Sequence, residues 1–143
     1  MTTTEQLTQV FNDNFVAYFR SHVAHVNIMG RNFTADHQLL GGVYESLQEQ
    51  IDTIGELLRS LQEFMPNDLH QVMMDSMIMP DPIEGDADEL LAAVRDDLAQ
   101  LKECYIELMS VAQSEGHEEI ANYAQDRILA LAKHIWMFDS TLG

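Results

Sequence analysis

Apolar positions recur every three or four residues along most of this chain, which is the spacing typical of amphipathic helices. The first such run begins after Thr2 and Glu5, whose spacing matches a helix capping box. It predicts a helix over about residues 4–28, ended by Gly30, in which the stripe is formed by Leu7, Phe11, Phe15, Tyr18 and His22.

The second run is more regular and predicts a packed bundle helix that Thr34 could cap and Pro66 would follow. Its apolar stripe consists of Leu40, Val43, Leu47, Ile51, Ile54, Leu58 and Leu61. A neighbouring stripe is polar and includes Gly41 and Gly55. Because glycine inside a helix costs about 1 kcal/mol relative to alanine, we expect this second face to pack closely, as in a contact between subunits.

The remaining chain predicts a short helix over residues 67–77, a turn-rich connection over 79–86, and two further long helices. Asp86 and Glu89 open the first of these helices, Gly116 stops it, and the last runs over about 117–141. No segment has the alternation of a strand. The sequence therefore predicts one all-α domain over residues 1–143, a four-helix bundle with a short extra helix in the crossover between its second and third long helices.

Charge and cysteine content narrow the function classes. The chain carries 24 acidic and 7 basic residues, a net charge of −17, which disfavours binding to DNA and attracts cations. Its single cysteine, Cys104, excludes an intramolecular disulfide framework and fits a reducing compartment. With no signal peptide and no apolar span of membrane length in the sequence, we expect a cytoplasmic protein without a membrane partner.

Metal-type ligands concentrate around the turn between the first two predicted helices. His25 ends the first helix, His37 begins the second, and Asp52 and Glu56 lie one turn apart further along it. Imidazole and carboxylate together suit a first-row metal such as iron, zinc or manganese. His37 and Asp52 are 15 residues apart on one helix, so a rise of 1.5 Å per residue separates them by roughly 22 Å.

A single ion cannot bridge that distance, so a shared site requires two copies of the chain. An antiparallel pair of these helices about a two-fold axis would bring the histidines of one copy near the carboxylates of the other. The alternative is that all four residues are buried polar groups at a subunit interface without metal. A ferritin-type site inside one bundle is excluded, because none of the six histidines has a glutamate three residues before it.

Three ordered motifs resemble those of the Dps proteins, the miniature ferritins. They are HVNIMGRNFTADH from His25, IDTIGELL from Ile51 and AKHIWMF from Ala132, and the likeness extends over about residues 10–142. The resemblance implies a dodecameric shell that oxidises Fe(II), often with hydrogen peroxide, and stores ferric mineral. It also implies ferroxidase sites at two-fold interfaces, with His25 and His37 from one subunit and Asp52 and Glu56 from its partner.

The chain departs from the family pattern at positions that bear on this site. Gly41 stands where the family usually has an acidic residue, so one carboxylate ligand is absent. Val26 replaces a tryptophan after the first histidine, and Leu57 replaces an arginine after Glu56. Basic N-terminal residues that many relatives use to hold DNA are also missing, since the first basic residue is Arg20.

Two further acidic sets have candidate roles in such a shell. Glu45 and Glu49 could face the interior and nucleate mineral, or they could form a solvated acidic face. Glu118, Asn122 and Asp126 recur every four residues where the family lines its three-fold pores, although acids at a helix start also complement the helix dipole.

The resulting expectation is a ferroxidase that stores iron in a homo-oligomeric shell with weak or absent DNA binding. The alternative is a shell with a degenerate ferroxidase site that acts as a passive metal store or a nucleoid-associated assembly.

Overall fold

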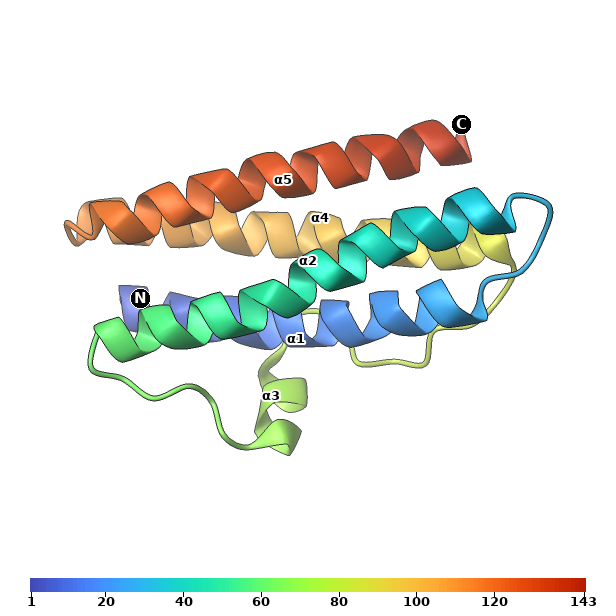
Figure 1. The fold of residues 1–143 in the computed structure, drawn as a ribbon. Helices are drawn as coiled ribbons and strands as arrows, with labels where there is room; N and C mark the ends of the chain where they lie inside the picture. The colour runs from blue at the N-terminus through green and yellow to red at the C-terminus, as the bar shows by residue number, and fades with distance from the viewer.

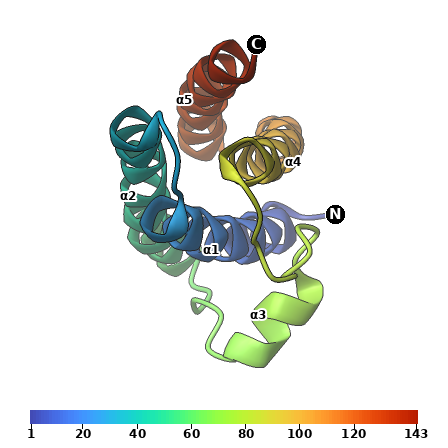
Figure 2. The same cartoon turned by 90° about the vertical axis from the view of Figure 1, so that its right-hand side faces the viewer.

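Five helices and no strand make up the protein in a computed structural model that describes all 143 residues. The helices are α1 (Thr3–Asn27), α2 (Phe33–Ser60), α3 (Leu69–Asp75), α4 (Ala87–Ser114) and α5 (Glu118–Leu142). The four long helices form a bundle and α3 lies outside it (Figure 1; end-on in Figure 2). The predicted four-helix bundle with an extra helix in the crossover is confirmed.

Local signals in the sequence explain most helix ends. Thr2 and Glu5 form a capping box on α1, and Asp86 and Glu89 form one on α4. Gly116 follows α4 with a φ of 80°, a left-handed conformation that glycine adopts without strain. The prediction for α2 was wrong in detail, because the helix begins at Phe33 after Asn32 and Thr34 is not its cap.

One cluster of 28 buried apolar side chains fills the centre of the bundle. The inward stripe predicted for the second helix is largely confirmed, since five of its seven residues are fully buried and only Ile51 and Leu61 are half-buried. The stripe predicted for the first helix is only partly right: Leu7 and Phe11 are in the core, but Phe15, Tyr18 and His22 are only half-buried. None of the helices combines the length and apolar character needed to span a membrane.

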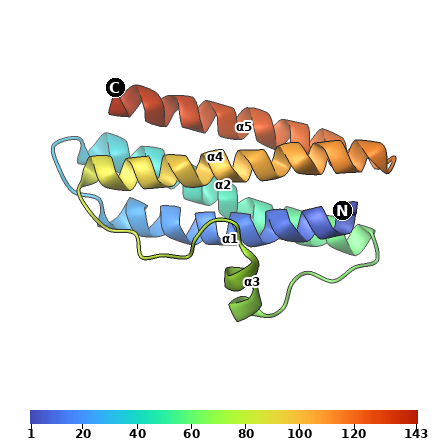
Figure 3. The same cartoon turned by 180° about the vertical axis from the view of Figure 1, so that it is seen from behind.

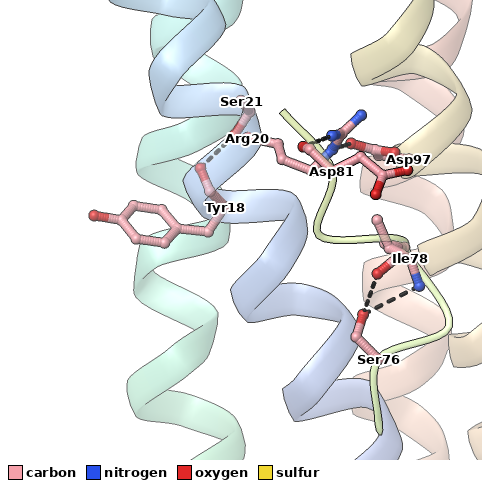
Figure 4. Close-up of polar contacts among 7 residues, drawn as sticks. All are labelled: Tyr18, Arg20, Ser21, Ser76, Ile78, Asp81 and Asp97. Atoms are coloured by element: carbon pink, nitrogen blue, oxygen red, sulfur yellow. Dashed lines mark hydrogen bonds and ion pairs between the residues drawn. The ribbon is translucent and has the colours of Figure 1, made fainter. Parts of the chain in front are cut away.

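The connection between α2 and α4 runs the length of the bundle, because α2 ends at one end and α4 begins at the other (Figures 1 and 3). Polar contacts tie it to α1. The Asp13 carboxylate accepts a hydrogen bond from the backbone N–H of Met77 at 2.8 Å. Arg20 pairs with Asp97 at 2.7 Å and also donates to the carbonyl of Asp81 (Figure 4). These contacts hold α3 and the crossover segment beside α1.

Candidate metal centre

His25 and His37 face each other across the junction of α1 and α2. The Nδ1 atom of His25 lies 2.7 Å from the carbonyl oxygen of His37, and the Nδ1 atom of His37 lies 2.7 Å from the carbonyl oxygen of His25. The two rings stack with centroids 3.8 Å apart and planes inclined by 17°. The junction therefore holds both imidazoles in one fixed arrangement.

This reciprocal pairing determines which nitrogen is available to a metal. A carbonyl oxygen can only accept a hydrogen bond, so each Nδ1 must carry the proton and donate it. Each neutral ring then has its lone pair on Nε2. Ligating histidines in metal sites are oriented in this way, with the second ring nitrogen donating to a carbonyl or carboxylate.

Gly41 allows the His25 ring to lie where it does. A Cβ atom at position 41 would come within 3.0 Å of His25 Cε1 and 3.2 Å of its Nδ1, closer than ordinary van der Waals contact. The second glycine of the polar stripe, Gly55, is covered by Met65, whose Sδ would lie 2.9 Å from an added Cβ. The expected close packing of both glycines is found within the chain, and the contact of this face with another subunit stays a prediction.

Asp52 and Glu56 are exposed on α2, one turn apart. The pKa of the Glu56 carboxyl is raised above its usual value, because its protonated form can donate a hydrogen bond to Asp52 and because the two carboxylate charges repel each other. No group of three or more histidine, cysteine or acidic side chains within one chain is arranged to hold a metal. The histidine pair and the carboxylate pair are thus separate in a single subunit, as the helix length requires.

The other candidate residues are accessible. Glu45 and Glu49 are exposed on α2, and Glu118, Asn122 and Asp126 are exposed on the first turns of α5. Trp136 on α5 is 64% exposed and so is not in the core of this chain.

Sequence reasoning missed the ring contacts that extend from the histidine pair into α2. Tyr44 stacks on His22 with centroids 4.0 Å apart and planes inclined by 2°, and it lies 4.9 Å from the His25 ring. The sequence spacing did indicate that these rings share helix faces, since Tyr44 is seven residues after His37 and His22 is three before His25. Only the angle between the two helices, however, determines which rings meet.

Comparison with known proteins agrees with this architecture. The model of the Ferritin-like domain family matches residues 4–143. Antigen TpF1 of Treponema pallidum is 31% identical over 139 residues, covering 96% of this chain and 78% of that protein. The DNA protection during starvation protein of Helicobacter pylori is 24% identical over 144 residues, covering 100% of both chains. The structure of Dps from Listeria innocua superposes with a TM-score of 0.95 at 23% identity, covering 100% of this chain and 95% of that one.

The family match spans nearly the whole chain, and the fold of Dps structures is reproduced with the short helix in its crossover. The chain therefore belongs to the ferritin-like superfamily and, within it, to the Dps family.

Proposed function

We propose that this protein oxidises Fe(II), with hydrogen peroxide as oxidant, at sites shared between two subunits, and stores the ferric product inside a dodecameric shell. The observation that carries the proposal is the reciprocal hydrogen bonding of His25 and His37. These hydrogen bonds place the proton of each ring on Nδ1 and leave Nε2 available to bind a metal. They also restrict the rotation of both rings.

The partner subunit would complete the ligand set. Asp52 and Glu56 of one chain are too far along α2 to reach the histidines of the same chain. A two-fold axis between antiparallel α2 helices would instead bring the carboxylates of one subunit beside the histidines of the other. Two imidazoles and two carboxylates form a ligand set of the type that binds Fe(II), and zinc would compete for it.

Iron is the substrate in this scheme, and the residues act by binding and positioning it. The carboxylates compensate the charge of the ferrous ion, which increases as it is oxidised. Carboxylate ligands thereby favour the ferric product over the ferrous reactant. An open coordination position would admit the peroxide.

The acidic surface fits the transport of iron through a shell. A net charge of −17 raises the local concentration of cations. In the proposed assembly, Glu118, Asn122 and Asp126 line the route of entry, and Glu45 and Glu49 bind ferric iron at the inner surface.

The test is Fe(II) oxidation by peroxide in the assembled protein, measured with the variants His25→Ala and Asp52→Ala. We expect both variants to assemble. Both should lose metal binding, measured by calorimetry, and both should lose the rapid oxidation of Fe(II). Gln48→Ala, an exposed change on the same helix, is the control and should behave as wild type. Equal oxidation rates in the wild type and both ligand variants would refute the site.

A second candidate function rests on Gly41, which supplies no side chain next to His25. A shell with a weakened site would bind metal passively or associate with the nucleoid without catalysing oxidation. The same assay separates the two functions, because a passive store binds iron at His25 but oxidises it no faster than the His25→Ala variant.

A further inference from the structure

A small cavity lies between α1, α3 and the segment that leads from α2 to α3. Figures 1 and 3 show this segment and α3 beside α1, outside the four-helix bundle. The volume of the cavity is about 150 Å³, and none of its eight lining residues is a lysine or an arginine. Apart from a proline and a valine, every lining residue has an oxygen in its side chain: Thr8, Asn12, Asn67, Asp68, Gln71 and Asp75.

Asn12 contributes a buried amide to the wall of this cavity. The residue is 4% exposed, and its Oδ1 atom makes no hydrogen bond. The hydroxyl of Thr8, one turn earlier on α1, does not satisfy it, because this hydroxyl donates to the carbonyl oxygen of Thr4 at 3.0 Å. A buried amide oxygen without a partner destabilises the folded chain. Its position in the wall therefore points to a ligand that the chain does not itself supply.

Asp68 and Asp75 bracket α3 and place two negative charges at the same cavity. The Oδ1 of Asp68 accepts a hydrogen bond from the backbone N–H of Gln71 at 3.2 Å, and the Oδ1 of Asp75 accepts one from the Gln71 side chain at 2.8 Å. No basic side chain forms an ion pair with either aspartate. The second oxygen of each carboxylate is thus free to bind a cation, and water alone would leave both charges uncompensated.

We propose that this cavity binds Ca²⁺, independently of the proposed iron site. Calcium takes about six to eight oxygen ligands from carboxylates, amides, carbonyls and water in a flexible arrangement. The wall supplies the carboxylates of Asp68 and Asp75, the amide oxygens of Asn12 and Asn67, and the hydroxyl of Thr8. The cavity also has room for water ligands, because a water molecule occupies about 30 Å³.

The same set of ligands disfavours other ions. Oxygen ligands alone suit magnesium, calcium and manganese, whereas the wall has no histidine or cysteine of the kind that favours zinc. Magnesium requires a nearly ideal octahedron with short metal–oxygen distances and keeps several of its waters. Side chains drawn from two helices and a connecting segment fit the more flexible coordination of calcium better.

A bound ion would fix the first half of the crossover segment on α1. The second half is already attached, because Asp13 accepts a hydrogen bond from the backbone N–H of Met77 at 2.8 Å and Gln9 donates to the carbonyl of Asp75 at 2.9 Å. Calcium would connect Asp68, just before α3, to Asn12 on α1. It would thereby slow the local opening of α3.

The test is hydrogen–deuterium exchange of the backbone amides of α3 in the assembled protein, with and without about 5 mM Ca²⁺ at constant ionic strength. We expect Ca²⁺ to slow exchange over residues 69–75 in the wild type. The effect should be lost in Asp68→Asn/Asp75→Asn, which removes both charges while the new amide oxygens still accept the hydrogen bonds from Gln71. The matched control is Glu63→Gln/Glu84→Gln, which removes two charges at exposed positions of the same crossover segment and should keep the effect.

Asn12→Leu gives a second readout. Removing the unpaired amide should raise the melting temperature in EDTA and abolish the response to Ca²⁺, because only a bound ligand satisfies this oxygen. A response to Ca²⁺ that persists in Asn12→Leu or in Asp68→Asn/Asp75→Asn would overturn the site. Exchange in the wild type that Ca²⁺ leaves unchanged, or that Mg²⁺ slows equally, would also overturn it, the latter by assigning the effect to screening of the acidic surface.

Discussion

Replacing Gly41 by alanine tests whether the orientation of His25 governs metal binding. The new methyl group would lie 3.0 Å from His25 Cε1, so the ring must move by a few tenths of an ångström. The His25 ring has little room to move, because the His37 ring is stacked 3.8 Å away and the Nδ1 of His25 is hydrogen-bonded to the His37 carbonyl at 2.7 Å. We expect the hydrogen bond between His25 and the His37 carbonyl to lengthen.

The expected loss of metal affinity follows from what the hydrogen-bond partners of ligating histidines contribute in other metal sites. Removing a group that orients a ligating histidine costs about tenfold to a hundredfold in affinity. For Gly41→Ala we expect a loss of about tenfold, or about 1.4 kcal/mol, because the bond is distorted rather than removed. Stability should change little, because the gain of about 1 kcal/mol in helix propensity is opposed by the close contact.

Gly42 provides the matched control. It is exposed on the same helix and an added Cβ would meet nothing within 4 Å. Gly42→Ala should therefore gain about 1 kcal/mol in the free energy of unfolding without changing metal affinity. Calorimetric titration with Zn(II) and anaerobic Fe(II) measures both variants. Wild-type affinity in Gly41→Ala would show that the His25 hydrogen bond does not position a ligand.

Gly41→Asp separates the steric effect from the effect of a carboxylate. Compared with Gly41→Ala it adds charge and coordinating oxygens at the same position. It should bind a dication more tightly than Gly41→Ala and oxidise Fe(II) faster. Equal affinity in the two variants would mean that residue 41 does not face the metal.

Three further predictions address the remaining structure. Cys104 is buried, and burial raises the pKa of its thiol, so a thiol-specific reagent at pH 8 should label it only after unfolding; rapid labelling of the native protein would contradict its placement. Leu58→Ala, at a fully buried position in the bundle, should lower the free energy of unfolding by about 2–5 kcal/mol in chemical denaturation, whereas a change below 1 kcal/mol would place Leu58 outside the core. A gel-shift assay with plasmid at about 0.15 M salt should show no stable complex, because the chain carries 24 acidic residues against 7 basic ones; tight, salt-sensitive retention would contradict this.

The helices and their order could be predicted because the signals are local. Capping boxes at Thr2 and Asp86 and the glycine at 116 determine helix ends through contacts within one turn. The inward face of the first helix was harder to predict from the sequence. Phe15, Tyr18 and His22 have helical spacing, but their position depends on where α2 crosses α1, and the structure places them at the edge of the core.

The sequence indicated which residue types could form the candidate site, and that assignment stays a prediction, but it did not indicate their geometry. Helix length alone showed that His37 and Asp52 of one chain cannot share an ion, and the structure agrees within one chain. The reciprocal bonds between His25 and His37 depend on the turn that brings two backbone carbonyls beside two rings, which no spacing rule encodes. The packing of Gly55 against Met65 likewise joins residues whose contact depends on the path of the chain after α2.

The claim that two subunits share each metal site is tested most directly by mixing subunits with complementary defects. One chain carries His25→Ala and His37→Ala, the other Asp52→Ala and Glu56→Ala, and the two are co-expressed with different tags and purified as mixed shells. A mixed pair has one site with all four ligands and one with none, so random pairing restores about one quarter of the wild-type sites. We predict that Zn(II) bound per subunit and the rate of Fe(II) oxidation rise to about that fraction in mixed shells, while each parent stays near zero. Mixed shells that bind and oxidise no more than their parents would contradict the shared site.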